Sequence, residues 1–102
     1  MKTKVIFRKY PKDGDIIALF PLDLGDNSPY TCSSYMHVGQ HGAADPLMVI
    51  QTTKLARPTE YKDLARELTR LGYKLDIIKR NRYSFLTSRQ RELKAMREQD
   101  TA

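Results

Sequence analysis

Hydrophobic residues near the start of the chain form two short runs that are typical of a β-hairpin. Val5–Phe7 and Ile16–Phe20 consist mainly of β-branched and aromatic side chains, which favour strands. Pro11 and the Asp13-Gly14 pair lie between the two runs, and both favour turns. The pattern predicts two antiparallel strands joined by a turn.

The middle of the chain carries weaker patterns. Pro21 and the stretch Gly25–Pro29 favour a loop, and the half-polar residues Tyr30–Met36 predict a third strand near a sheet edge. Asp45 followed by a proline is typical of a helix N-cap, which favours a short helix over Pro46–Thr53. Four β-branched residues within that range favour an extended segment instead, and the pattern leaves both structures open.

The amphipathic segment from Thr59 to Leu71 gives the clearest prediction, a helix with one apolar face. Its apolar residues recur at spacings of three and four; they are Tyr61, Leu64, Ala65, Leu68 and Leu71. Thr59 is the predicted cap and Gly72 the predicted stop. Residues Tyr73–Lys79 then alternate between apolar and polar positions, which predicts a strand in the same sheet as the hairpin.

The C-terminal segment has little hydrophobic patterning. Ser88 is a candidate cap for a helix over Arg89–Glu98, but only Leu93 and Met96 offer apolar contacts there. We therefore expect a peripheral or fraying helix.

The complete pattern predicts an α+β fold. We expect one domain over residues 1–80, with residues 81–102 as a basic C-terminal extension that is partly helical. The domain has two layers: a mainly antiparallel sheet of about four strands, and the main helix, residues 59–71, packed on one face.

The chain of 102 residues is long enough to bury a hydrophobic core without crosslinks. The single cysteine, Cys32, excludes an intramolecular disulfide and is expected to be a small buried hydrophobic residue. No apolar run reaches the length of a signal peptide or a membrane span. We expect a cytoplasmic protein without membrane contact, and the sequence does not predict its oligomeric state.

Both histidines lie in one segment, Tyr35–Asp45, together with two glycines and a carboxylate. We select His37, Gln40, His41 and Asp45 as a candidate polar site, because imidazole titrates near neutral pH and also binds metals. The segment is compatible with a general acid/base site of a hydrolase, with a metal site and with a structural turn.

The metal hypothesis needs a divalent ion held by His37, His41 and Asp45. In an extended strand the two histidines stand about 13 Å apart, at roughly 3.3 Å per residue, so only a tight turn at Gly39-Gln40 brings them together. Glycine permits such a turn because it visits positive φ at little steric cost. The competing structural hypothesis is a polar turn in which the imidazoles bond to backbone carbonyls.

Positive charge is concentrated in the second half of the chain. The net charge is +6; residues 1–50 carry five Lys or Arg and five Asp or Glu, whereas residues 51–102 carry thirteen and seven. Tyr83 and Phe85 are interleaved among the cations, and cations with aromatic rings suit phosphates and unpaired bases. The candidate nucleic-acid-binding residues are Lys79, Arg80, Arg82, Arg89 and Arg91. The competing interpretation is a solvated basic tail that maintains solubility.

Several segments resemble a family of small bacterial and phage-like proteins for which no activity is established. They are Val5–Lys9, Asp15–Pro21, Tyr35–Asp45, Arg57–Tyr61 and Leu71–Tyr73, and the histidine segment is the most specific of them. The resemblance covers residues 4–80 and implies a compact α+β domain in a bacterial or mobile-element setting. It implies no functional residue.

The sequence supports three functional hypotheses. The first is a small accessory protein that binds nucleic acid, or a nucleic-acid-handling protein, through the basic C-terminal third. The second is a metal-dependent hydrolase centred on His37, His41 and Asp45. The third is a structural or protein-interaction module without catalysis. We favour the first, in which the protein is not an enzyme.

Overall fold

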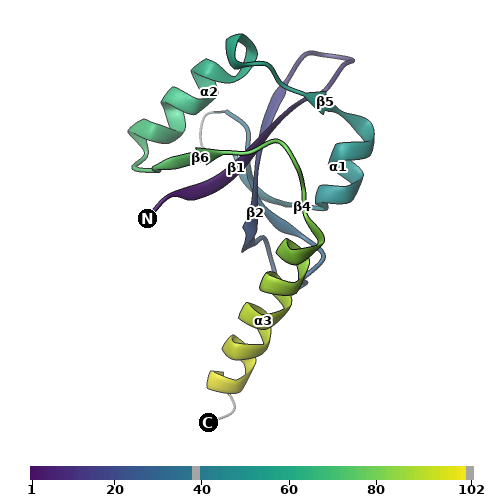
Figure 1. Ribbon diagram of the computed structural model, residues 1–102, viewed down its shortest axis with the longest axis vertical. Helices are drawn as coiled ribbons and strands as arrows, with labels where there is room; N and C mark the ends of the chain where they lie inside the picture. The colour runs from purple at the N-terminus through teal and green to yellow at the C-terminus, as the bar shows by residue number, and fades with distance from the viewer. Residues whose placement is uncertain (38–39, 101–102) are drawn as a thin grey trace.

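The computed structural model describes residues 1–37 and 40–100. This part of the chain folds into one sheet and three helices, joined by loops (Figure 1). The strands are β1 (Thr3–Lys9), β2 (Ile16–Leu24), β3 (Cys32–Tyr35), β4 (His41–Ala44), β5 (Lys54–Leu55) and β6 (Leu75–Ile77). The helices are α1 (Pro46–Thr52), α2 (Pro58–Arg70) and α3 (Tyr83–Asp100). These elements confirm the predicted α+β class.

The predicted hairpin of β1 and β2 lies at the centre of the sheet. The strand order is β4-β3-β2-β1-β5 with antiparallel neighbours throughout, and β6 pairs with β1 in parallel. β6 pairs with the start of β1 and β5 with its end, on the side of β1 opposite β2. The sheet is therefore mainly antiparallel, as the sequence predicts, and β1 has partners along both sides.

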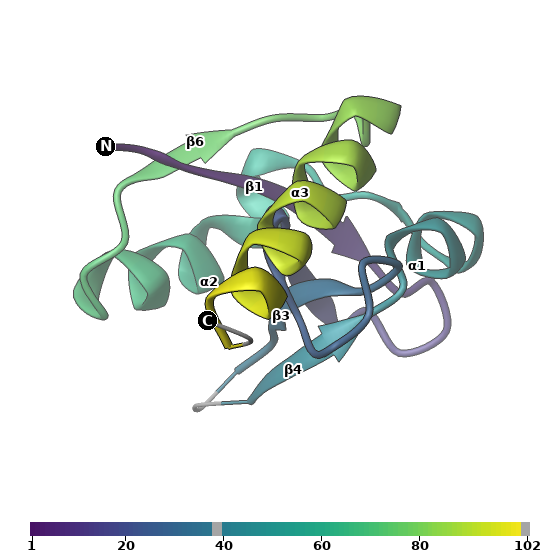
Figure 2. The same cartoon turned by 90° about the horizontal axis from the view of Figure 1, so that it is seen from below.

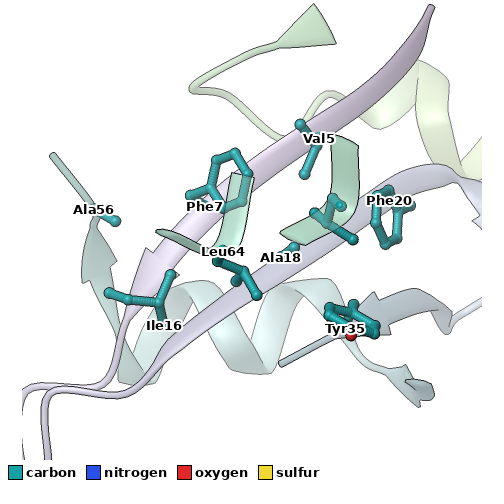
Figure 3. Close-up of a cluster of buried hydrophobic side chains, with 9 residues drawn as sticks. Val5, Phe7, Ile16, Ala18, Phe20, Tyr35, Ala56 and Leu64 are labelled. Atoms are coloured by element: carbon teal, nitrogen blue, oxygen red, sulfur yellow. The ribbon is translucent and has the colours of Figure 1, made fainter. Parts of the chain in front are cut away.

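Hydrophobic clusters cover both faces of the sheet. On one face, Val5 and Phe7 of β1 pack against Leu64 of α2, and Figure 3 shows these side chains together. On the other face, Ile6 packs in a cluster with Val49 of α1. The two helices consequently lie on opposite sides of the sheet (Figure 2). The sequence predicts the helix on the first face, and the cover on the second face is an addition to that prediction.

Helix α2 confirms the main predicted helix, with one correction at its start. Arg57, and not Thr59, is the N-cap residue; its backbone N–H donates to Glu60 Oε1 at 3.0 Å, and the Glu60 carboxylate also pairs with Lys9 of β1. Both contacts hold the pKa of Glu60 below its usual range. Gly72 ends the helix with a φ of 105°, a conformation that favours glycine, so the predicted stop is confirmed.

Helix α1 confirms the helical alternative for residues after Asp45. The Asp45 carboxylate accepts hydrogen bonds from the backbone N–H groups of Leu47, at 3.0 Å, and Met48, at 3.5 Å. At the other end, the Arg8 guanidinium donates to the carbonyls of Ile50 and Thr53. Side chains thus form hydrogen bonds with backbone N–H groups at the start of this short helix and with carbonyls at its end. These hydrogen bonds offset the low helix propensity of its β-branched residues.

The C-terminal helix is longer and better packed than the sequence predicts. We predicted a peripheral helix over Arg89–Glu98, but α3 begins at Tyr83 and packs on β2. Phe85, Arg89 and Leu93, spaced four residues apart, are all buried. The first half of α3 therefore belongs to the folded domain, while its second half extends away from the sheet (Figure 1).

Gly25, directly after β2, has no room for a side chain. A Cβ atom there would lie 2.5 Å from the carbonyl oxygen of Cys32 and 2.9 Å from the Cα of Ala43. Because both neighbours are backbone atoms, we expect Gly25→Ala to lower the free energy of unfolding by about 1 to 3 kcal/mol. Urea denaturation followed by circular dichroism measures this effect.

The matched control is Gly42→Ala in β4. Its nearest neighbour would be Ser34 Oγ at 3.6 Å, an ordinary van der Waals distance. We expect this variant to stay within about 0.5 kcal/mol of the wild type. Equal stability of the two variants would contradict the tight packing at Gly25.

Candidate functional site

The histidine segment forms the hairpin connection between β3 and β4. The backbone N–H of Met36 donates to the Gln40 carbonyl at 3.1 Å, and that of Gln40 donates to the His37 carbonyl at 3.2 Å. A tight connection therefore exists close to the predicted Gly39-Gln40 turn, although Val38 and Gly39 themselves lie outside the described residues. This connection places the two histidines on either side of the turn.

The two imidazoles make different contacts. His41 is opposite Tyr35 in the strand pairing, and its ring meets the Tyr35 ring edge-on with the centroids 4.5 Å apart. His37 Nδ1 lies 3.6 Å from Glu67 Oε2 of α2. Both histidines and Gln40 are exposed. His37 thus faces a carboxylate and His41 faces an aromatic ring.

The predicted metal ligands do not gather. Among residues 1–37 and 40–100 the structure contains no group of three or more His, Cys, Asp or Glu side chains placed to hold a metal ion. Asp45, the predicted third ligand, instead caps α1. The geometry of the described residues therefore gives the metal-dependent hydrolase hypothesis no support.

Cys32 is a buried hydrophobic residue, as predicted. Its side chain is inaccessible to solvent, and this burial raises the pKa of the thiol to about 11. The carboxylates of Asp23 and Asp45 act in the same direction, while the Arg89 guanidinium acts against them. A thiol in this state is protonated near neutral pH and is a poor nucleophile.

Arg89 holds α3 against the sheet. The residue is only 3 % exposed. Its Nε donates to the Pro29 carbonyl at 2.8 Å, and its Nη1 donates to the Pro21 carbonyl. These carbonyls belong to β2 and to the loop before β3. The sequence groups Arg89 with the candidate nucleic-acid-binding cations, but its guanidinium is buried and bound to backbone oxygens.

Docking of α3 creates a groove with a basic lining at the junction between β6 and α3. The groove has a volume of about 670 Å³, and its cationic side chains come from β1 and from the segment that connects β6 to α3. These four residues, Lys4, Lys79, Arg80 and Arg82, define the basic groove. Ser84, in the first turn of α3, also lines it. Three of the predicted cations thus converge, whereas Arg91 lies exposed further along α3.

Among the residues that the structure describes, one carboxylate forms a salt bridge with the lining of the basic groove. Asp76 of β6 accepts a hydrogen bond from Lys4 Nζ at 3.0 Å. Lys79, Arg80 and Arg82 are exposed, and no salt bridge among the described residues involves them. The groove therefore presents at least three cations to an anionic ligand.

A second cavity, of about 430 Å³, lies beside the basic groove and shares Arg82 with it. We call it the aromatic cavity; its apolar lining consists of Tyr30, Pro46, Leu47, Tyr83 and Leu86. Asp45, Asn81 and Arg89 complete the lining. The structure thus brings Asp45, from the predicted polar site, next to two of the predicted cations.

Sequence reasoning missed several contributors to these cavities, including Lys4, Tyr30 and Leu47. Lys4 is far from the basic cluster in the sequence, and only the parallel pairing of β6 with β1 brings it close. Tyr30 and Leu47 were assigned to a strand and to a short helix without a functional role. The one signal in the sequence that could have indicated a role for Tyr30 and Leu47 is that they are hydrophobic residues next to loop and cap residues. This signal is weak in a single sequence.

Comparison with known proteins gives no further guide: no protein-family model matches the chain, and neither the curated proteins nor the solved structures provided a match. The described helices include none with both the length and the apolar character that crossing a bilayer requires. The candidate site therefore rests on the geometry of this chain.

We expect Arg89→Met to lower the free energy of unfolding by about 2 to 4 kcal/mol, because two carbonyls lose their charged donor. Arg91→Met removes the same charge from an exposed position of the same helix, so we expect a change of about 0.5 kcal/mol or less. Urea denaturation measures both variants. Equal losses would contradict the anchoring role of Arg89.

We expect the Cys32 thiol to resist alkylation in the folded protein at pH 8. Burial keeps reagents away, and a pKa of about 11 leaves very little thiolate at that pH. Because the folded pKa is raised, stability associated with this proton is present below about pH 9 and is lost as the pH rises towards 11. Mass spectrometry after iodoacetamide treatment, with and without urea, tests this. Rapid labelling without urea would contradict the burial.

Proposed function

We propose that this protein binds nucleic acid through the basic groove. The observation that carries the proposal is the convergence of Lys4, Lys79, Arg80 and Arg82 on one groove. Cations that converge neutralise neighbouring phosphates and release the counterions condensed on them, which is the main source of affinity for nucleic acids.

The position of the groove at the start of α3 adds to its affinity for anions. The helix spans 18 residues, and its first backbone N–H groups and the positive end of its dipole lie where Ser84 and Phe85 line the groove. The Phe85 N–H already donates to the Arg82 carbonyl. In the first turn, the N–H groups of Tyr83 and Ser84 are therefore the ones that the hydrogen bonds of the helix do not use. A hydroxyl and a helix start next to three exposed cations suit a phosphate.

The competing interpretation is a solvated basic tail, and the two interpretations require cations at different positions. Arg91, Lys94 and Arg97 lie exposed further along α3, whereas Lys79, Arg80 and Arg82 line the groove. A solubility tail requires only net charge, so both sets would contribute equally to binding of a polyanion. If the groove is the binding site, binding depends on the three cations that line it, Lys79, Arg80 and Arg82.

The role that we propose is that of a small accessory protein without catalytic activity. A nucleic-acid partner fits the cytoplasmic location that the sequence predicts. The histidine hairpin lies outside both cavities, since neither lining includes His37 or His41. The proposal therefore assigns these histidines no contact with the ligand.

We expect the wild type to bind a labelled oligonucleotide with strong salt dependence. For three phosphate contacts, the affinity falls about 20- to 40-fold between 50 and 200 mM salt. Replacement of Lys79, Arg80 and Arg82 together by glutamine removes most of the affinity at 50 mM salt and most of the salt slope. Fluorescence anisotropy measures both quantities.

The matched control replaces Arg91, Lys94 and Arg97 by glutamine, which changes the net charge by the same amount. We expect this variant to retain most of the affinity and the slope. If the two triple variants lose affinity equally, the basic groove is not the site. Binding that does not change with salt would contradict the proposal as a whole.

A further inference from the structure

The most exposed hydrophobic side chains of the described residues gather at the aromatic cavity. Apart from Met1, the highest exposed fractions among large hydrophobic side chains are those of Tyr83, at 80 %, Leu47, at 65 %, and Tyr30, at 63 %, and all three line this cavity. They come from three separate segments: α3, α1 and the loop before β3. Exposed apolar residues that gather around a concave site are typical of a ligand surface.

The aromatic cavity lies next to the basic groove, and Arg82 lines both. Tyr83 and Ser84 are neighbours in the chain, and they face the cavity and the groove respectively. A ligand that bridges the two sites therefore needs an anionic part and a flat apolar part next to it. A nucleotide within a strand has this composition.

We infer that the protein binds unpaired nucleic acid, with a base stacked against Tyr83 and Tyr30 in the aromatic cavity and the adjoining phosphates in the basic groove. This inference rests on the proposed function and specifies its ligand. In a duplex the faces of the bases are covered by their neighbours, so an aromatic side chain can stack only on a base that is unpaired.

The lining of the aromatic cavity includes two oxygen acceptors that suit a base with hydrogen-bond donors. The Asp45 carboxylate repels a phosphate, and it accepts hydrogen bonds but donates none when ionised. Asn81 Oδ1 is buried without a hydrogen-bond partner in the described structure, which makes it a second acceptor that lacks a donor. The exocyclic amino group of cytosine offers two N–H donors to these two acceptors, whereas uracil offers one N–H at N3 and a carbonyl oxygen at position 4, so we expect cytosine to be preferred over uracil.

Fluorescence anisotropy tests the inference with labelled 12-nucleotide RNA and DNA strands and with the duplex of the same DNA sequence. We expect the wild type to bind at least one single strand more tightly than the duplex, whichever sugar it prefers. We expect Tyr83→Ala and Tyr30→Ala each to weaken single-strand binding about 5- to 100-fold. Tyr83→Phe keeps the ring and is expected to stay within about 3-fold of the wild type.

The control is Met96→Ala, which removes an exposed hydrophobic side chain from the extended half of α3. We expect it to bind like the wild type. Equal affinity for duplex and single strands, together with unchanged binding by Tyr83→Ala, would overturn the inference and leave the proposed groove standing. If none of the three probes binds, both the inference and the proposed function are overturned.

Base preference is measured with oligo(C) and oligo(U) RNA strands, whose bases carry an amino group or a carbonyl oxygen at position 4 and an acceptor or a donor at N3. We expect cytosine to be preferred about 5-fold by the wild type. Asp45→Asn keeps an N-cap residue for α1 but removes the charge and an acceptor, so the preference is expected to fall. A preference for uracil in the wild type, or an unchanged cytosine preference in Asp45→Asn, would overturn this part of the inference.

Discussion

The candidate site depends on the hydrogen bonds that the buried Arg89 guanidinium donates to backbone carbonyls. A charged side chain is costly to bury unless its donors are satisfied, and here backbone carbonyls from β2 and the following loop accept from it. Phe85 and Leu93, one turn to either side, supply the hydrophobic contact. This contact fixes the start of α3 beside β1 and α1, so the basic groove and the aromatic cavity exist only while α3 is docked.

The site combines segments that are distant in the sequence. Lys4 comes from the first strand, Tyr30 from the loop before β3 and Asp45 from the cap of α1, and all meet residues 79–86 (Figure 2 shows α3 in front of the sheet). β1 makes this possible because its residues are buried towards both faces, which allows α1 to pack on the side of the sheet opposite α2, and the start of α3 lines the aromatic cavity together with α1.

Local patterns were sufficient to predict most of the fold. The hairpin, the amphipathic helix α2, the cap at Asp45 and a strand after Gly72 each have signals within a few residues. Helical cover on the second face was missed, although Val5–Phe7 is a continuous apolar run, which is typical of a strand buried on both faces. The packing of α3 was missed because its central buried residue is an arginine, and a pattern of hydrophobic residues counts it as polar. Of the candidate residues, Lys79, Arg80 and Arg82 converge on the groove, whereas the metal set depended on a convergence that sequence spacing cannot establish.

The most direct test of this account is to map the binding surface by nuclear magnetic resonance. A single-stranded oligonucleotide is titrated into ¹⁵N-labelled protein, and changes in amide shifts are followed along the chain. The account predicts the largest changes at residues 79–86, with further changes at Tyr30 and Leu47 and none on the outer face of α2. Changes confined to Arg91–Gln99 of α3 would contradict it.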